Sequence, residues 1–136
     1  MIEDVLIKGG IIRGFYRGLR CNNMNNSRIE HLRVSGNNST GIYFDGVNSG
    51  QFNGNTVSDC SSYNNGASGI YLDGSNGQCN GNTVSDCSFY NNGGAGVYFD
   101  GSYSGECKGN TIADCTISEN DSYGVYLNGT FSDQCD

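Results

Sequence analysis

Gly41-Ile42-Tyr43-Phe44-Asp45-Gly46 is the first clear copy of a motif that recurs three more times along this chain. The later copies are Gly69-Ile70-Tyr71-Leu72-Asp73-Gly74, Gly96-Val97-Tyr98-Phe99-Asp100-Gly101 and Gly124-Val125-Tyr126-Leu127-Asn128-Gly129. The copies start at positions 41, 69, 96 and 124, which gives steps of 28, 27 and 28 residues. A fixed period of this size is typical of a solenoid, in which each coil buries its apolar side by stacking on its neighbours.

A second motif keeps the same period, and it extends the repeat toward the N-terminus. Its copies are Asn55-Thr56-Val57-Ser58-Asp59-Cys60, Asn82-Thr83-Val84-Ser85-Asp86-Cys87 and Asn110-Thr111-Ile112-Ala113-Asp114-Cys115. Continuing the period backwards aligns Ile2, Val5 and Ile7 with Ile29, Leu32 and Val34. We therefore expect about five coils of 27–28 residues in one domain, residues 1–136, without capping elements.

The apolar residues within each coil alternate as they do in a strand. Ile42 and Phe44 are expected to point inward and Tyr43 outward, because successive side chains of a strand point to opposite faces. The segments are short, they are separated by Gly, Asn and Ser turns, and no window is typical of an amphipathic helix. The pattern predicts an all-β fold, a single-stranded parallel β-helix.

The repeat Asn-x-Val-x-x-Cys followed by Gly-Ile-x-Leu resembles the parallel β-helix repeat of pectate-lyase-like and NosD-like proteins. The opening segment, residues 5–15, is similar to the same superfamily. This resemblance implies a right-handed coil over essentially the whole chain. It leaves function open, because the superfamily includes lyases, hydrolases, epimerases, phage spikes, surface proteins and adhesins. In composition, the chain also resembles the proteinaceous sheaths of some methanogenic archaea.

Composition excludes several classes of partner. The acidic balance of the chain, a net charge of -7, argues against a nucleic-acid partner, and no apolar run is long enough to span a membrane. Seven cysteines without a CxxC or CxxH pair favour an oxidising location, outside the cell or on its surface.

Stacked coils bring equivalent residues into ladders about 4.8 Å apart. We expect an outward aromatic ladder, an asparagine ladder and two inward cysteine ladders. Phe15 would continue the aromatic ladder, and Leu32 and Val5 would continue the cysteine ladder that contains Cys60. Their members are Tyr43, Tyr71, Tyr98 and Tyr126; Asn55, Asn82 and Asn110; Cys60, Cys87 and Cys115; and Cys79, Cys107 and Cys135 with Phe52 and Met24.

An outward acidic ladder is the candidate metal site. Asp45, Asp73 and Asp100 would repel one another at this spacing, and a Ca²⁺ ion would relieve the repulsion. The alternative is that each carboxylate caps its own turn. Arg17 and Asn128 flank this first acidic ladder. A second acidic ladder has the same two interpretations, and it comprises Asp59, Asp86 and Asp114 with His31 and Asp4.

The tyrosine and cysteine ladders also allow two interpretations each. Tyrosine rings could stack on sugar rings, or they could pack against each other or against another copy. The cysteines could form disulfides between adjacent coils, and Cys21 and Cys135 could join successive subunits. Otherwise they are buried as small apolar side chains.

We expect a non-enzymatic structural protein. No catalytic motif of the superfamily can be placed on these residues, and His31 is the single histidine. The first hypothesis is an extracellular protein that assembles end to end with itself into an amyloid-like, disulfide-reinforced sheath, surface layer or filament. The alternative is a carbohydrate-binding or carbohydrate-active β-helix, or a fragment of one, with a polysaccharide partner. A third is a spike segment that trimerises side by side. We expect no cofactor apart from the Ca²⁺ of the acidic ladder.

Overall fold

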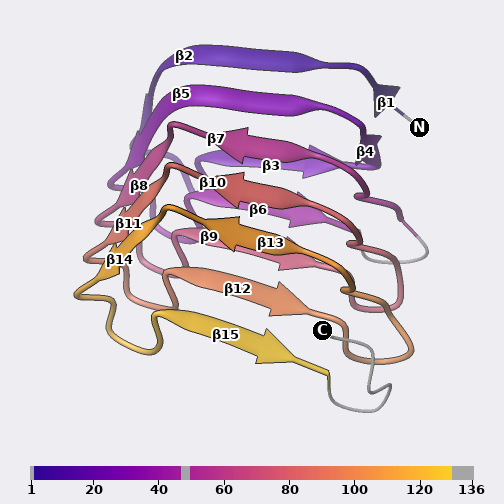
Figure 1. Ribbon diagram of the computed structural model, residues 1–136. Coiled ribbons are helices and arrows are strands. Elements are labelled where there is room, and N and C mark those ends of the chain that lie inside the picture. The colour runs from indigo at the N-terminus through magenta and orange to yellow at the C-terminus, as the bar shows by residue number, and fades with distance from the viewer. Residues whose placement is uncertain (1, 47–49, 130–136) are drawn as a thin grey trace.

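A computed structural model describes residues 2–46 and 50–129. The chain winds into a stack of coils, with β2, β5, β7, β10 and β13 one below another and β15 at the opposite end from β2 (Figure 1). The described residues contain no helix, and so no helix that could cross a membrane. The strands are β1 (Ile2–Glu3), β2 (Leu6–Arg13), β3 (Leu19–Asn22), β4 (Met24–Asn25), β5 (Arg28–Ser35), β6 (Ile42–Asp45), β7 (Thr56–Ser58), β8 (Ser61–Tyr63), β9 (Ile70–Asp73), β10 (Thr83–Ser85), β11 (Ser88–Tyr90), β12 (Val97–Asp100), β13 (Thr111–Ala113), β14 (Thr116–Ser118) and β15 (Val125–Asn128).

All paired strands are parallel, and each pairs with its counterpart in the neighbouring coil. One sheet has the order β15-β12-β9-β6-β3, and another has the order β13-β10-β7-β5-β8-β11-β14 with β2 also paired to β5. The long strand β5 continues around a corner that later coils break into two short strands, so β7 and β8 both pair with it. This topology confirms the predicted parallel β-helix.

The core runs along the inside of the stack. Ile42, Phe44 and Ile70 are fully buried, which confirms the predicted inward positions. Tyr43, predicted to point outward, is only 6% exposed, and Arg17 lies over its ring at 4.3 Å. Phe44 stacks on Phe52 with ring centroids 3.8 Å apart. Each buried aliphatic or aromatic side chain contributes about 1.5–3 kcal/mol, and a coil gains this only when its neighbours cover it.

The first coil does not follow the predicted register. Ile7 pairs with Ile29, and Ile2 pairs with Met24, so the alignment of Ile2 with Ile29 was wrong. The physical reason is a loop that the first coil lacks. Asn22 pairs with Asp45, and the side chain of the next residue, Asn23, accepts the backbone N–H of Gln51. Residues 46–50 therefore have no counterpart in the first coil, which advances 22 residues instead of 27 or 28.

Three of the ladder extensions change with this register. Arg20, and not Phe15, pairs with Tyr43. Gly10, and not Val5, pairs with Leu32 at the head of a cysteine ladder. Asn22, and not Arg17, pairs with Asp45.

Residues with positive φ turn the chain at the corners of each coil. His31, Asp59, Asp86 and Asp114 have φ between 51° and 54° at one such corner, where the first coil has Gly9. Asp and Asn tolerate this left-handed conformation better than most other residues, which explains the second acidic ladder without a ligand. Asp4 lies at a different corner, beside Asn26, so its alignment with His31 was also wrong.

Two asparagine ladders join the coils from inside. The predicted ladder is confirmed: Asn55 donates its backbone N–H to Asn82 Oδ1 at 2.9 Å and its Nδ2 to the same atom at 3.1 Å. Asn82 repeats both bonds to Asn110. A second ladder, which the sequence analysis missed, comprises Asn37, Asn65, Asn92 and Asn120.

Candidate functional site

The most regular surface is the outward face of the sheet formed by β3, β6, β9, β12 and β15. Tyr43, Tyr71, Tyr98 and Tyr126 lie in register on this face, one per coil. The Tyr71 and Tyr98 rings are stacked, with centroids 4.4 Å apart and planes 3° apart. The other two neighbouring pairs are tilted at 5.2 Å and 4.8 Å. Tyr71 and Tyr98 thus cover each other's ring faces, which leaves little flat surface for a sugar ring at this pair.

Tyrosine hydroxyls and aspartates interlock along this face. Tyr43 donates its hydroxyl to Asp73 Oδ2 at 2.6 Å, and Tyr71 donates to Asp100 Oδ2 at 2.8 Å. These two tyrosines therefore bond the aspartate of the next coil, whereas Tyr98 donates to Asp100 of its own coil at 3.3 Å. Burial raises the pKa of both hydroxyls, and the neighbouring carboxylates raise it further. A hydrogen bond from a hydroxyl to a carboxylate is among the stronger hydrogen bonds in proteins.

The aspartates of the predicted Ca²⁺ site are buried and already have hydrogen-bond donors. Asp45, Asp73 and Asp100 are 8%, 5% and 6% exposed. Arg20 forms an ion pair with Asp45. The backbone N–H groups two residues after Asp73 and Asp100 donate to their Oδ1 atoms at 3.1 Å and 2.9 Å, which is the turn-capping alternative. Among the described residues, no group of three or more His, Cys, Asp or Glu side chains is placed to hold a metal. The Ca²⁺ site stays a prediction.

The six described cysteines are free thiols. Cys60 donates to the Ser58 carbonyl at 3.1 Å, and its backbone N–H donates to Cys87 Sγ at 3.4 Å. Burial raises the pKa of Cys21 to about 12, which disfavours its reactive thiolate. This geometry fits stacked buried thiols, and the disulfides stay a prediction. Cys21 pairs with Phe44 and so belongs to neither cysteine ladder, and Cys135 lies outside the described residues. The remaining thiols are Cys79, Cys107 and Cys115.

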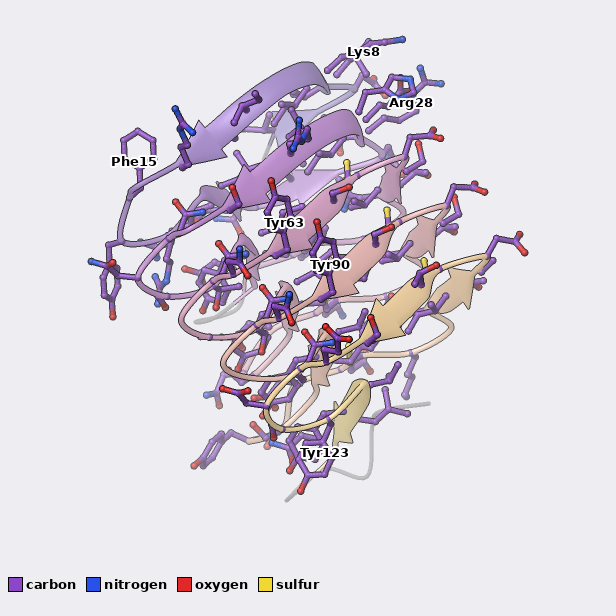
Figure 2. The ribbon with its side chains drawn as sticks, turned by 90° about the vertical axis from the view of Figure 1, so that its left-hand side faces the viewer. Lys8, Phe15, Arg28, Tyr63, Tyr90 and Tyr123 are labelled. Carbon is purple, nitrogen blue, oxygen red and sulfur yellow. The ribbon has the colours of Figure 1, made fainter. Side chains whose placement is uncertain are left out.

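A second outward aromatic pair was missed in the sequence. Tyr63 and Tyr90 stack with centroids 4.8 Å apart and planes 3° apart, and Figure 2 shows them one above the other. Arg33 of the preceding coil donates to the Tyr63 hydroxyl at 3.1 Å. The signal was the repeated Tyr-Asn-Asn after β8 and β11. On this face too, the tyrosine rings and hydroxyl make contacts between coils.

A shallow polar pocket lies beside the loops that follow β9 and β12. Its volume is about 340 Å³, and its lining includes Gln51, Gln78 and Glu106, one from each of three coils. Asn80 donates to Glu106 Oε2 at 3.0 Å. Amide and carboxylate groups in such a row are suited to hydroxyl-rich ligands.

The last described coil is open. Val125 and Leu127 are 43% and 54% exposed, although Val97 and Phe99 at the same ladder positions one coil earlier are 0% and 3% exposed. Tyr123 and Tyr126 are exposed beside them. The difference arises because no coil among the described residues covers this edge, so this coil presents apolar side chains and strand edges together.

Comparison with known families agrees with the coil geometry. A family model described as "right handed beta helix region" matches residues 2–135. No curated protein and no solved structure gives a significant match to the chain.

Proposed function

The chain belongs to the right-handed β-helix family, and we propose that it is an extracellular structural member that assembles by stacking its coils on those of further copies. The family includes both enzymes and non-enzymes, so membership alone does not decide between them. The observation that carries the proposal is the open coil, in which Val125 and Leu127 occupy ladder positions that are buried in the preceding coil.

The open coil is suited to receiving another coil. Its strands β13, β14 and β15 each pair on one side only. Unpaired parallel edges with apolar side chains are a template for a further strand. Covering Val125 and Leu127 removes apolar surface from water at about 25 cal/mol per Å². The result would be a longer solenoid of the same cross-section, growing by about 4.8 Å per coil.

The sides of the solenoid favour a structural role over catalysis. The Tyr71 and Tyr98 rings cover each other, and the hydroxyls of Tyr43 and Tyr71 are bound to Asp73 and Asp100. The carboxylates that could serve as acid and base therefore already accept hydrogen bonds from the tyrosines. His31 lies 3.9 Å from Asp59 at an exposed corner.

Disulfides would reinforce the assembly after it forms. Cys60 and Cys87 occupy the same ladder position in adjacent coils, and a mild oxidant such as oxidised glutathione would convert such a pair of thiols into a disulfide, with the glutathione disulfide reduced. The odd number of seven cysteines leaves a thiol for a bond between copies. This chemistry requires an oxidising location.

Sedimentation and negative-stain electron microscopy over a wide concentration range test the proposal. We expect filaments or sheets that loosen on addition of reductant. The variant Val125→Asp/Leu127→Asp should stay monomeric, because it places charges on the open coil. The control Ser58→Asp/Ser88→Asp adds the same charge on outward positions of inner coils and should assemble. A wild-type protein that stays monomeric at high concentration under oxidising conditions would refute the proposal.

A carbohydrate-binding function is the second candidate, and the pocket with Gln51, Gln78 and Glu106 favours it. Titration of acidic and neutral oligosaccharides against the wild type and Glu106→Ala, followed by calorimetry, tests it. Binding that is lost in the variant would support a polysaccharide partner. Equal heats for both proteins would exclude this pocket.

A further inference from the structure

Charge is divided along the axis of the solenoid. Residues 2–46 carry six basic and four acidic side chains, a net charge of +2, whereas residues 50–129 carry one basic and eight acidic side chains, a net charge of -7. Figure 2 shows Lys8 and Arg28 at the end of the stack opposite to Tyr123. The basic residues are Lys8, Arg13, Arg17, Arg20, Arg28, Arg33 and, in the acidic part, Lys108.

The two end coils have opposite signs on their outward positions. The first coil carries four basic side chains, Lys8, Arg13, Arg17 and Arg20, against the exposed acids Glu3 and Asp4, a net charge of +2, and Arg20 is already paired with Asp45. The last described coil carries Asp114, Glu119 and Asp121, which are exposed and make no ion pair with another described residue. Opposite charges on two ends of one molecule attract when copies meet end to end with the same polarity, and like ends repel.

We propose that copies join head to tail, with the basic first coil of one molecule seated on the acidic last coil of another in the register that coils use within the chain. This inference rests on the proposed assembly and specifies its polarity and its contact surfaces. The second copy is the occupant because its first coil has the complementary charge.

The strand register supports this junction on the inside. Following the paired positions from coil to coil, Ile7 shares a ladder with Ile112, and Ile12 shares one with Ile117. Leu19 shares a ladder with Val125 in the same way. A first coil placed on the open coil would therefore cover apolar side chains with apolar side chains.

The same register pairs the charges on the outside. Lys8 would lie over Ala113, one residue from Asp114. Arg13 would lie over Ser118, one residue from Glu119. Within the chain, Lys8 already reaches Glu30 of the neighbouring coil at 3.2 Å, so a base on this strand can contact an acid one coil away.

The junction should be weaker than the contacts inside the chain. In the first coil, Val5 and Phe15 occupy the positions at which later coils have the asparagines of the two ladders. The hydrogen bonds show this register: the Val5 N–H donates to Ser27 Oγ, and the Phe15 N–H donates to Asn37 Oδ1. Neither side chain can accept the asparagine hydrogen bonds of a coil beneath it. Association held by apolar contact and exposed ion pairs should therefore be reversible and sensitive to salt.

Complementary charge reversal tests the polarity. The basic-end variant is Lys8→Glu/Arg13→Glu, and the acidic-end variant is Asp114→Lys/Glu119→Lys. Each alone has two ends of the same sign, so we expect its critical concentration for assembly to rise roughly 10- to 30-fold. A 1:1 mixture restores opposite ends at every junction and should return to within about threefold of the wild type.

Controls separate this inference from the proposed assembly. Ser58→Lys/Ser88→Lys changes outward positions of inner coils and should stay within about twofold of the wild type. Circular dichroism first establishes that each variant folds, and milder Gln substitutions at the same positions replace any that does not. Wild-type assembly with no effect of charge reversal, or without recovery in the mixture, would overturn the head-to-tail inference and leave assembly standing. Wild-type protein that never assembles would refute the proposed function itself.

Discussion

Replacing Asn65 by alanine should strongly destabilise the protein, because this side chain joins three coils. Asn65 is 2% exposed and lies in the middle of its ladder. Its Oδ1 accepts the Asn37 backbone N–H at 3.2 Å and Asn37 Nδ2 at 2.9 Å. Its Nδ2 donates to Asn92 Oδ1 at 3.0 Å and also approaches Ser62 Oγ and the Val34 carbonyl.

The magnitude follows from the groups that lose a partner. Asn65→Ala leaves two buried donors of Asn37 without an acceptor, and it removes a donor from Asn92. Each unsatisfied buried donor costs about 1–3 kcal/mol. We therefore expect a loss of about 3–5 kcal/mol in the free energy of unfolding, a large part of the stability of a small domain.

Urea unfolding followed by far-UV circular dichroism measures this loss, at a concentration at which the protein is monomeric. The control is Asn38→Ala in the equivalent turn of the preceding coil, where the side chain is exposed and the change should cost less than about 0.5 kcal/mol. An Asn65→Ala variant as stable as Asn38→Ala would show that water, and not the ladder, satisfies these groups, and the argument would be wrong.

Three other predictions test the face, the core and the corners. Stability should fall as the pH rises above about 10, because the folded state raises the pKa of Tyr43 and Tyr71 above the ordinary value and the unfolded chain therefore releases these protons first. The Tyr43→Phe/Tyr71→Phe variant should show a flatter profile of urea midpoint against pH. Ile70→Ala should cost about 2–5 kcal/mol, but Val125→Ala on the open coil should cost less than about 1 kcal/mol in the monomer, and similar losses in thermal melts would contradict the exposure of that coil. Gly81→Ala should cost about 1–2 kcal/mol through its φ of 62° alone, because no atom lies within 4 Å of an added Cβ; Gly81→Asn should cost less, and equal melting temperatures for both variants would reject this reasoning.

The sequence was sufficient for the repeat and for the side-chain parity. The Gly-Ile-Tyr-Phe-Asp-Gly motif recurs at a nearly constant step, and the stacking of Tyr71 on Tyr98 follows directly from that step. A periodic pattern fixes which residues share a ladder wherever the coils have equal length. This is why the asparagine ladder through Asn82 was predicted correctly.

Coil length could not be read where the pattern was ambiguous. Residues 2, 5 and 7 have the same spacing as residues 7, 10 and 12, and either set matches the apolar positions of the second coil unless Gly10 is rejected as a core residue. The structure uses the second set, because the first coil lacks the loop that follows Asp45. A periodic argument assumes that no loop is deleted, so it aligned Ile2 with Ile29, five residues beyond its true partner Met24.

The repeat pattern also could not predict which groups the outward polar side chains would bond. Tyr43 and Asp73 lie 30 residues apart, and nothing in either motif shows that one hydroxyl reaches the carboxylate of the next coil. The burial of Asp73 follows from the neighbouring coils and not from its own strand. Metal binding and turn capping were therefore both compatible with the sequence.

The unequal coil lengths would appear under mechanical load. Each coil pairs only with its neighbours, so a force that pulls the two ends apart should peel the solenoid one coil at a time. A coil of 27 or 28 residues releases about 90 Å of extended chain, and the 22-residue first coil releases about 75 Å. A force–extension record would thus contain regular steps and one shorter step, and that short step would report when the N-terminal end yields.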